Sequence, residues 1–402
     1  MKKILYISQT GITEALGRSQ VLEYLIDLSE NNKIYLLSFE RKNDLEHINE
    51  VKKLTDKYGI NWQYLIYSNK YGVFSTVIQI IKVLFLGSRC IKKNKIDIIH
   101  ARSMIPATMG LLLKKIHGTK LLFDIRGFAI DEKVDLLRLK KNSLLFKVLK
   151  KLDNMLYKQS DHIIALTYIS KEILQNSILI PEKKITVIPT CANKNIFQIM
   201  PVVEQQIFKK SLGYQAKNKI ILHTGTTTGF YDFDLEVILV KKIMEIDKDI
   251  HFLVLNKNEH DSIQDAFSQY NLPKERLRVI SSSFEGVYKY LNIANVSLFF
   301  IKPSYAKQSS APTKFAENVA CYLPSITNSG VGDMAFYMEK YDVGCLLDLD
   351  DLPQNMDKAI KKLLPYLNQE KKIETQVYDN LFELNFNKEI AVEKYQTIYN
   401  KL

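Results

Sequence analysis

The sequence predicts an α/β protein with two similar domains, each built around a parallel β-sheet. Short apolar runs alternate with stretches of helical periodicity along the chain, which is the pattern of strand–helix–strand units. An apolar run that ends in a glycine-bearing polar turn occurs twice, at residues 4–11 (ILYISQTG) and at 220–225 (IILHTG). The chain has 402 residues, enough for two domains of roughly 150–200 residues, each with its own hydrophobic core.

The first domain is predicted to begin with a βαβ unit. Its strands lie at residues 2–8 and 33–39, and its helix at 20–30 follows a loop that contains Gly11 and Gly17. Strands joined through a helix run parallel. The glycine fingerprint of a dinucleotide site is incomplete, so no dinucleotide cofactor is predicted. Further strands of this half are expected at 62–66, 96–100, 120–123, 162–165 and 184–188.

Proline residues mark the passage between the two halves. Pro181, Pro189 and Pro201 lie close together and indicate a linker. We therefore expect domains at residues 1–190 and 191–384. Strands of the second half are predicted from Lys219 and then at 250–255, 277–280, 296–301, 325–327 and 344–347, and residues 389–402 have helical periodicity.

Composition and charge narrow the possible functions. The chain has 56 basic and 44 acidic residues, a net charge of +12, which favours anionic partners such as nucleoside diphosphates or acidic lipids. No nucleic-acid-binding signature occurs, so nucleic acid is not an expected partner. The four cysteines are far apart and outside any metal-ligand spacing, as expected for free thiols in the cytoplasm. The N-terminal apolar run is too short for a signal peptide.

Two predicted helices have unusual surfaces. Residues 73–86 are apolar nearly all round, and about 14 residues are too few to span a bilayer. The segment from Arg138 to Lys158 has one apolar face and one lysine-rich face. Asp153 is its one acidic residue. This pattern is typical of an interfacial helix attracted to anionic lipid, and equally of a core-packing helix with a solvated basic face. Our hypothesis is peripheral association with an anionic membrane.

The stretch 309–324 (SSAPTKFAENVACYLP) carries the main predicted binding site. It follows an apolar strand and predicts a helix that begins near Pro312. Free amides, the positive end of the helix dipole and the Lys314 ammonium together favour an anion, most naturally a phosphate. Glu317 follows on the same face one turn later, where a carboxylate suits a ribose diol. The alternative is an ordinary capped helix whose lysine and glutamate are solvated.

The pattern Ser-x-Pro-Thr-Lys-x-x-Glu at 310–317, followed by 328–333 (NSGVGD), resembles the donor-site signature of bacterial retaining glycosyltransferases of family 4. Segments 16–22 (LGRSQVL), 100–103 (HARS) and 123–128 (FDIRGF) resemble the branch that builds surface polysaccharides. The resemblance implies a GT-B fold, in which two Rossmann-like domains face each other across a cleft and residues 385–402 pack back on the first domain. It also implies transfer of a sugar from a nucleoside diphosphate to a hydroxyl of a lipid-linked saccharide, with retention.

The resemblance assigns roles to residues of the second domain. Glu317 would bind the ribose hydroxyls, and Thr313 and Lys314 the pyrophosphate. Lys314 would also stabilise the charge of the departing diphosphate. The remaining donor-binding candidates are Ser282 near the base, Ser310, the loop residues Gly225 and Thr226 with their backbone amides, and Gly17 of the first domain. The alternative for Gly17, of equal weight, is a simple loop glycine.

The first domain would hold the acceptor and the reactive face of the sugar. Asp124 and Arg126 follow a predicted strand and are the catalytic candidates there; Arg126 would bind an anionic group and Asp124 would orient it. His100, Arg102 and Ser103 end the neighbouring strand and are acceptor candidates. The alternative for His100 is a buried histidine that is satisfied by its neighbours.

Two departures from the family pattern bear on activity. Ser309 stands where the commoner signature has a glutamate, and residues 225–230 lack its arginine and lysine. A non-catalytic binding protein and a nucleotide-sugar epimerase of the same fold therefore remain alternatives. The pair Asp348 and Asp350 mimics a metal-binding motif of another glycosyltransferase fold, but we interpret it as a loop or cap. We expect no metal, no cofactor and a cytoplasmic location, peripheral on the inner face of the plasma membrane.

Overall fold

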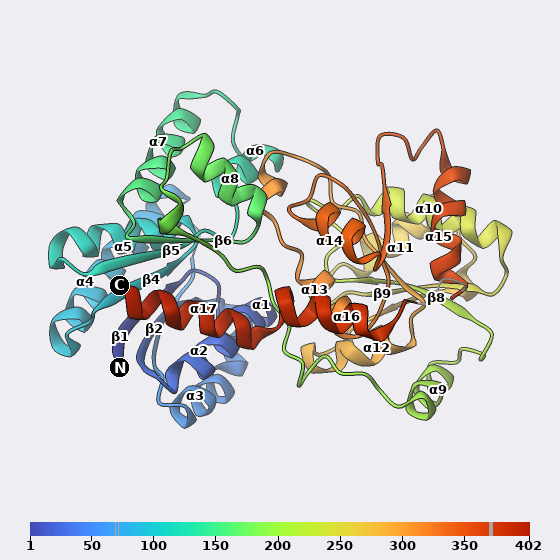
Figure 1. The fold of residues 1–402 in the computed structure, drawn as a ribbon, viewed down its shortest axis with the longest axis horizontal. Helices are drawn as coiled ribbons and strands as arrows, with labels where there is room; N and C mark the ends of the chain where they lie inside the picture. The colour runs from blue at the N-terminus through green and yellow to red at the C-terminus, as the bar shows by residue number, and fades with distance from the viewer. Residues whose placement is uncertain (69, 71, 370–372) are drawn as a thin grey trace. The chain divides into compact units, whose positions relative to one another are not determined.

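The computed structural model describes residues 1–68, 70, 72–369 and 373–402, which form two compact α/β units (Figure 1). Unit 1 comprises Met1–Pro189 together with Lys388–Leu402, and unit 2 comprises Thr190–Asn387. The chain therefore leaves unit 1 and returns to it through its last helix.

Unit 1 contains a seven-stranded parallel sheet in the order β3-β2-β1-β4-β5-β6-β7. The order reverses between β1 and β4, so the carboxyl ends of these two strands form the topological switch point where α/β sheets bind ligands. The strands are β1 (Lys2–Ser8), β2 (Asn32–Glu40), β3 (Asn61–Ile66), β4 (Ile98–Arg102), β5 (Lys120–Asp124), β6 (His162–Ala165) and β7 (Ile185–Val187).

Helices cover both faces of this sheet (Figure 1). Helices α5 and α8 begin within three residues of the strands that precede them, and α8 starts with a capping box formed by Thr167 and Ser170. The helices of unit 1 are α1 (Ala15–Gly17), α2 (Glu23–Ser29), α3 (Ile48–Lys57), α4 (Val73–Asn94), α5 (Met104–His117), α6 (Ala129–Asp135), α7 (Leu144–Gln159), α8 (Tyr168–Asn176) and α17 (Lys388–Lys401), with a π-helical turn at Arg18–Leu22.

The last helix, α17, packs beside α2 (Figure 1). Lys388 Nζ lies 2.9 Å from Asp27 Oδ2 and 3.4 Å from Glu23 Oε2 of α2. Asn32 Nδ2 donates a hydrogen bond of 2.7 Å to Gln396 Oε1. These polar contacts and the buried Tyr395 and Tyr399 attach the end of the chain firmly to unit 1.

Unit 2 repeats the same plan with six parallel strands in the order β10-β9-β8-β11-β12-β13. Its switch point lies between β8 and β11. Side chains alternate between two cores: Ile220 and Leu222 point to one, and Ile221 to the other. The strands are β8 (Lys219–Thr224), β9 (Ile250–Leu255), β10 (Leu277–Ile280), β11 (Val296–Leu298), β12 (Ser325–Asn328) and β13 (Gly344–Leu347).

The helices of unit 2 surround this sheet. They are α9 (Val202–Ser211), α10 (Phe233–Ile246), α11 (His260–Gln269), α12 (Val287–Ile293), α13 (Thr313–Ala320), α14 (Met334–Tyr341), α15 (Met356–Leu367) and α16 (Thr375–Leu381), followed by a π-helical turn at Phe382–Phe386. The full-length parallel sheets of both units confirm the predicted α/β fold class.

Several element boundaries differ from the predictions. The helix predicted at 73–86 continues to Asn94 and ends where Lys95 adopts a left-handed φ of 54°. The argument that this segment is too short to cross a bilayer was therefore wrong. Among the described residues, Phe74–Asn94 is the helix with the length and apolarity to span a membrane, with a mean hydropathy of 1.5 and 28% of its most apolar window buried.

Two other helices begin later than expected. The helix predicted from Arg138 begins at Leu144, because Asn142 has a left-handed φ of 64° and Ser143 caps the new start by accepting a hydrogen bond from the Phe146 amide. The helix near Pro312 begins at Thr313 as α13, without a side-chain cap. Ser309 and Ser310 lie just ahead of this helix as candidates for its cap, but neither side chain caps it.

Candidate functional site

The start of α13 and the loop after β8 meet at the switch point of unit 2. Lys314 lies in the first turn of α13 and is 8% exposed. Its Nζ would lie 3.8 Å from a Cβ placed on Gly225, the first residue after β8. The structure thus brings two of the predicted donor-binding segments together, although 89 residues separate them in the chain.

The ammonium of Lys314 is buried without a hydrogen-bond acceptor among the described residues. It lies 4.1 Å from the centroid of the Tyr231 ring and 5.3 Å from that of Phe299. The faces of these rings stabilise a cation, but they cannot accept three N–H hydrogen bonds. A buried charge without a partner costs free energy, so this ammonium is well placed to receive an anion.

Glu317 follows Lys314 on α13 and is partly buried. Burial raises its pKa to about 7, and the nearby Lys314 ammonium opposes this shift. Its charge consequently changes near neutral pH. Cys321, one turn further on, is buried, and its thiol pKa is raised by burial and by Glu317. The polar face of α13 therefore carries the Lys314 amine and a carboxyl group whose charge changes near neutral pH.

The loop after β8 is held in place by a carboxylate that the sequence analysis missed. Glu259 Oε1 accepts a hydrogen bond of 2.7 Å from Thr226 Oγ1, and Glu259 Oε2 accepts one of 2.8 Å from the Thr227 amide. Thr228 Oγ1 and Asn256 Nδ2 also donate to this carboxylate. Although desolvation raises the pKa of Glu259, these hydrogen bonds lower it to about 2.

Other contacts of this loop limit what its backbone can offer to a ligand. Gly225 has a φ of +93°, and its amide donates 2.8 Å to the carbonyl of Leu255 on β9. The amide that was predicted to face a phosphate is therefore used inside the sheet. Beneath the loop, Nδ1 of the buried His223 is hydrogen-bonded to Glu236 Oε2, at a distance of 2.7 Å. Its Nε2 lies 3.2 Å from the Thr226 carbonyl.

The remaining donor candidates lie at the same edge of the sheet but touch none of these groups in the contacts described. Ser310 donates its amide to the carbonyl of Lys307. The neighbouring Ala311 carbonyl accepts 2.6 Å from Thr190 Oγ1. Thr313 is the partly buried first residue of α13. Ser282 follows β10, and its Oγ donates to the Ser283 carbonyl.

In unit 1, five side chains surround the carboxylate of Asp124 at the end of β5. Asp124 Oδ2 lies 3.8 Å from Nη1 of both Arg102 and Arg126 and 4.0 Å from His100 Nε2. Two tyrosines of α17 complete the group. Tyr395 donates to Asp124 Oδ2 at 3.4 Å, and the Tyr399 hydroxyl lies 2.7 Å from His100 Nδ1. The sequence could not connect α17 with this cluster, because about 270 residues intervene.

The electrostatics of this cluster favour an uncharged His100. Burial lowers its pKa well below 6.5, and Arg102 and Arg126 lower it further. Two guanidinium groups then share one carboxylate, which leaves a buried excess of positive charge. Arg102 Nε and Asp124 Oδ1 have no hydrogen-bond partner among the described residues. His100 is 1% exposed and its Nδ1 is hydrogen-bonded to Tyr399, but its Nε2 has no hydrogen-bond partner among the described residues.

Backbone strain is concentrated at the same strand ends. Ser103 after β4 has a φ of 74°, and Arg126 after β5 has a φ of 53°. Non-glycine residues rarely adopt such angles, and they occur often at functional sites. The Ser103 amide donates 2.8 Å to the Asp124 carbonyl, which ties the two strand ends together.

Gly17 lies against its own loop rather than toward open space. A Cβ at this position would lie 1.8 Å from the carbonyl oxygen of Gly11, so packing alone requires glycine here. The amides of this loop are also already bonded. Glu40 accepts from the Ile12 amide at 2.9 Å and from the Thr13 amide at 3.0 Å.

Two further predictions concern residues outside these clusters. Ser309 is fully buried and donates to the Ala306 carbonyl at 2.7 Å, so its side chain supports a turn. Asp348 Oδ1 accepts the Asp350 amide at 3.0 Å in an exposed loop after β13. This local turn agrees with the interpretation of the Asp348 pair as a loop.

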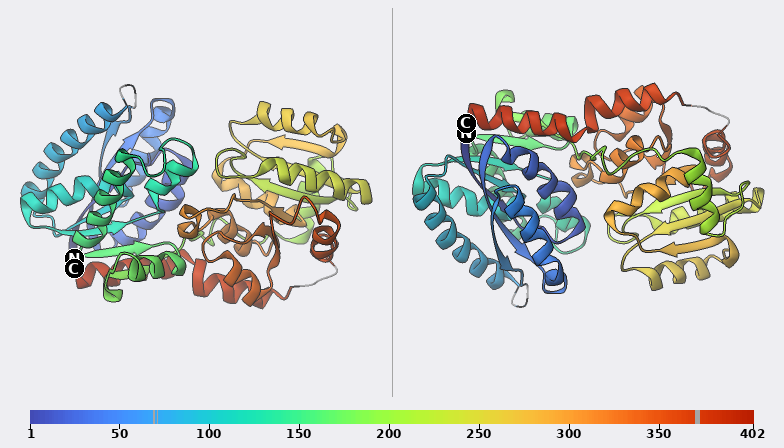
Figure 2. Two further views of the ribbon diagram at one scale, coloured as in Figure 1. Left: turned by 90° about the horizontal axis from the view of Figure 1, so that it is seen from above. Right: turned by 90° about the horizontal axis from the view of Figure 1, so that it is seen from below.

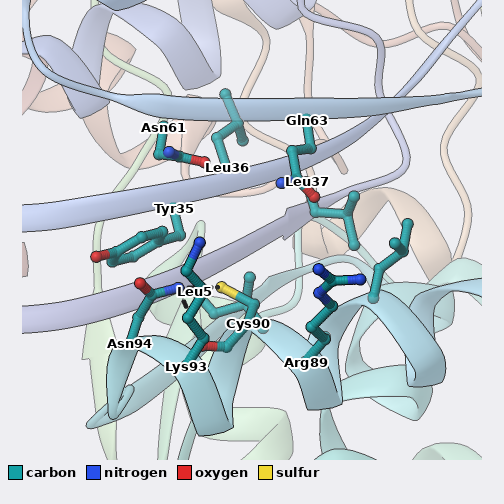
Figure 3. A pocket seen from close by; sticks show the side chains of 12 residues that line it. Leu5, Tyr35, Leu36, Leu37, Asn61, Gln63, Arg89, Cys90, Lys93 and Asn94 are labelled. Carbon is teal, nitrogen blue, oxygen red and sulfur yellow. Dashed lines mark hydrogen bonds between the residues drawn. The ribbon is translucent and has the colours of Figure 1, made fainter.

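A pocket of about 290 Å³ lies between β1, β2, β3 and the second half of α4 (Figure 3). Its polar lining includes Asn61, Gln63, Arg89, Lys93 and Asn94. Figure 3 shows Arg89, Lys93 and Asn94 reaching from the helix toward the strands. The pocket is separate from the Asp124 cluster and shares no residue with it.

Comparison with known proteins agrees with this architecture. Residues 30–195 match the family model "Glycosyltransferase Family 4". A glycosyltransferase from Rickettsia africae is similar over 100% of this chain and 98% of its own, with a TM-score of 0.69 and 17% identity. Sucrose-phosphate synthase from Thermosynechococcus elongatus is similar over 100% of this chain and 99% of its own, with a TM-score of 0.73 and 15% identity.

A third similar structure contains a nucleotide sugar. HepE from Anabaena in complex with UDP-glucose covers 100% of both chains, with a TM-score of 0.68 and 12% identity. A search of curated protein sequences gave no significant match. The two parallel sheets and the full-length structural similarity confirm the predicted GT-B fold, and residues 30–195 are similar to glycosyltransferase family 4.

Proposed function

We propose that this protein transfers a sugar from a nucleoside diphosphate sugar to a hydroxyl group of a lipid-linked precursor of a bacterial surface polysaccharide, with retention of configuration. The observation that carries the proposal is the Lys314 ammonium, buried beside the loop after β8 without an acceptor among the described residues. Such a cation suits the diphosphate of a donor. Complexes of the similar HepE with UDP and UDP-glucose make a uridine nucleotide the first candidate.

In this proposal α13 binds the donor through two neighbouring groups. Lys314 and the first turn of the helix hold the diphosphate, and Glu317 accepts hydrogen bonds from the ribose hydroxyls. As the bond between sugar and phosphate breaks, negative charge grows on the leaving diphosphate. Because Lys314 is already buried and oriented by Tyr231 and Phe299, it stabilises this charge without reorganisation.

The Asp124 cluster of unit 1 is the proposed site for the acceptor and the reactive face of the sugar. Arg126 and Arg102 supply positive charge in excess of the Asp124 carboxylate, which suits an anionic group on the acceptor. Asp124 orients Arg126. We assign no covalent nucleophile and expect no metal requirement, so activity should persist in EDTA.

The proposed location is the cytoplasmic face of the plasma membrane, where lipid-linked saccharides are accessible. The basic face of the region from Arg138 to Lys158 supports this proposal: Lys147, Lys151 and Lys158 are all exposed on α7.

A binding protein without turnover is the second candidate. The observation in its favour is Ser309, which is buried in a turn where the commoner signature has a glutamate. Sugar transfer, or slow hydrolysis of the donor, would exclude this candidate. An epimerase would change the sugar without releasing the nucleotide, so analysis of products without acceptor separates it from a transferase.

The first experiment is a thermal-shift screen with UDP, GDP, ADP, CMP and their sugars. The matching nucleotide should raise the melting temperature of the wild-type protein. Lys314→Ala and Glu317→Ala should each abolish this rise, whereas Lys361→Ala, a change of an exposed lysine on α15, should preserve it. A rise that survives in both α13 variants would place the nucleotide elsewhere.

A further inference from the structure

We propose that the outer surface of the layer formed by α4, α5 and α7 is a docking surface for an anionic lipid bilayer, with α4 inserting apolar side chains between the lipids. The first observation is that the amphipathic pattern of α4 is inverted over its first half. Its inner face buries the polar Ser75 and Gln79, at 5% and 6% exposure. Gln79 is satisfied there by the Ser68 carbonyl, to which its Nε2 donates at 2.7 Å.

The outer face of α4 carries large apolar side chains instead. Their positions recur every three or four residues, so they form one continuous stripe. A surface helix of a water-soluble domain normally turns such a stripe inward, and contiguous exposed apolar surface marks an interaction site. The exposed members are Phe74 (76%), Val77 (46%), Ile78 (48%), Ile81 (60%) and Phe85 (68%).

The neighbouring helices extend this surface. α5 packs between α4 and α7, and His117 of α5 lies 2.8 Å from Ser88 Oγ of α4. Both views in Figure 2 show α4 along the outer side of unit 1. The exposed apolar side chains of the other two helices include Ile116 (61%), Leu144 (80%), Leu145 (55%) and Val148 (56%).

The charge of the layer identifies the partner. Neither α4 nor α5 contains an aspartate or glutamate, and the one acidic residue of α7, Asp153, is buried and bonded to the Tyr157 hydroxyl. Basic side chains near a membrane are attracted to anionic headgroups. The exposed cations are Lys82, Arg89, Lys92, Lys93, Lys115, Lys147, Lys151 and Lys158, and none forms an ion pair within the described part of the chain.

The same charge argues against a second copy of this chain as the partner, because two acid-free basic surfaces would repel each other. The packing of α4 argues against a transmembrane orientation. Val83 and Ile91 are buried against unit 1, and a Cβ on Gly87 would lie 2.7 Å from Leu113 of α5. Removing α4 from the domain would expose this interface, so the helix lies on the bilayer as part of the folded unit.

The pocket under the second half of α4 offers a place for a lipid headgroup. Arg89 and Lys93 line it together with Asn61, Gln63 and Asn94, and Figure 3 shows both cations at the helix edge of the pocket. The headgroup phosphate would bind these two cations while the acyl chains meet the stripe that begins at Phe74.

This inference extends the proposed membrane association from α7 to α4. Its test measures binding without sugar transfer, so the failure of either proposal can be recognised separately. Full-length protein is sedimented with phosphatidylcholine vesicles that contain or lack phosphatidylglycerol. We expect binding only with phosphatidylglycerol. The double variant Phe74→Ser/Phe85→Ser should bind at least about tenfold more weakly, and Lys92→Glu/Lys93→Glu should bind more weakly and lose the salt dependence of the wild type.

The matched control is Val203→Ser/Ile207→Ser on α9 of unit 2, where both side chains are exposed (66% and 64%) beside Glu204. It should bind like the wild type. Because all these changes are at exposed positions, melting temperatures should be unchanged. The proposal is wrong if wild-type protein ignores phosphatidylglycerol or if the α4 variants retain full binding. It is also wrong if light scattering shows a dimer that the α4 change dissociates.

Discussion

The glycine-bearing loops after β1 and β8 occupy equivalent places in the two units, but their charges are balanced differently. Each loop is held by a carboxylate at or just beyond the end of the next strand. Glu40, at the end of β2, bonds the loop after β1, and Glu259, which follows β9, bonds the loop after β8. Glu40 is 0% exposed, and its bonds to the Ile12 and Thr13 amides close the loop. Beside the loop of unit 2, the Lys314 ammonium remains without an acceptor.

This difference distinguishes a structural loop from a ligand-binding one. A backbone amide that an internal carboxylate already occupies has no hydrogen bond left for a phosphate. The Ile12 and Thr13 amides of one loop and the Thr227 amide of the other are used in this way, so a side chain must contribute to the affinity for an anion. Unit 2 places a side-chain cation without an acceptor among the described residues next to its loop. Beside the loop of unit 1, Arg41 is paired with Glu14, and Arg102 and Arg126 lie around Asp124.

The largest effect is expected from breaking the balance of charges in unit 1. Asp124→Asn would leave the buried guanidiniums of Arg102 and Arg126 without their shared carboxylate. The free energy of unfolding should fall by roughly 3–5 kcal/mol, measured by urea denaturation. Asp56→Asn changes an exposed carboxylate of α3 and should be almost neutral. Equal stability of the two variants would mean that the cluster is hydrated and its charges are screened.

The corresponding change in unit 2 should affect activity instead of stability. Lys314→Met removes a buried cation that has no hydrogen-bond acceptor among the described residues, so the melting temperature without ligand should stay the same or rise. The value of kcat/KM for sugar transfer should fall by about 10²–10³, since the charge on the leaving diphosphate loses its stabilisation. A loss of stability with normal kcat/KM would show that Lys314 is structural.

The two loop carboxylates provide a matched pair of smaller effect. Glu40→Gln should lower the free energy of unfolding by about 2–3 kcal/mol, because the buried carboxyl group accepts several hydrogen bonds that the amide cannot all replace. Glu259→Gln should cost only about 1 kcal/mol, because solvent screens this partly exposed group. A reversed order in urea denaturation would contradict the comparison of the loops.

Glu259 also predicts a pH dependence at the acid end. Its pKa is lowered from 4.5 to about 2 by hydrogen bonds from Thr228, Thr226, Thr227 and Asn256, although burial opposes the shift. The stability that it contributes is therefore present above pH 4.5 and is lost as the pH falls toward 2. Urea titrations of wild type and Glu259→Gln should converge over this range.

Glu317 predicts the smallest effect, on binding near neutral pH. Burial raises its pKa to about 7, and the ionised form is the one that accepts hydrogen bonds from a ribose diol. Affinity for the nucleoside diphosphate should rise through pH 7, changing by about tenfold per pH unit below the pKa. The free energy of unfolding should fall as the pH rises from 4.5 to about 7, because the carboxyl stays protonated in the folded protein over this range. Glu317→Gln should show neither change, and an equally steep pH dependence in that variant would assign it to another group.

Much of the fold was predictable because it depends on local sequence patterns. The apolar runs at 2–8 and 250–255 became β1 and β9, and the glycine turns after β1 and β8 appeared where the repeat placed them. The start of α13 at Thr313 followed from Pro312. Lys314 was recognised as the main candidate for the same reason, since its position in the first turn depends on neighbours within a few residues.

Other features depended on segments that are distant in the chain. Glu259 and Glu40 could be suspected as acids near strand ends, but nothing local shows that they bond the loop beside them. Tyr395 and Tyr399 reach His100 and Asp124 only because α17 returns to unit 1. The length of α4 was missed because its pattern changes from apolar to basic after Leu86.

The sequence by itself determined the alternation of strands and helices, the two glycine loops and the cation at the start of α13, because backbone geometry repeats every two or 3.6 residues and is set by near neighbours. The tertiary structure alone decided which charges were neutralised and which stayed unpaired. It also decided that α4 turns Phe74 and Phe85 outward. Burial and partnership depend on which distant segments pack together, and no local pattern contains that information.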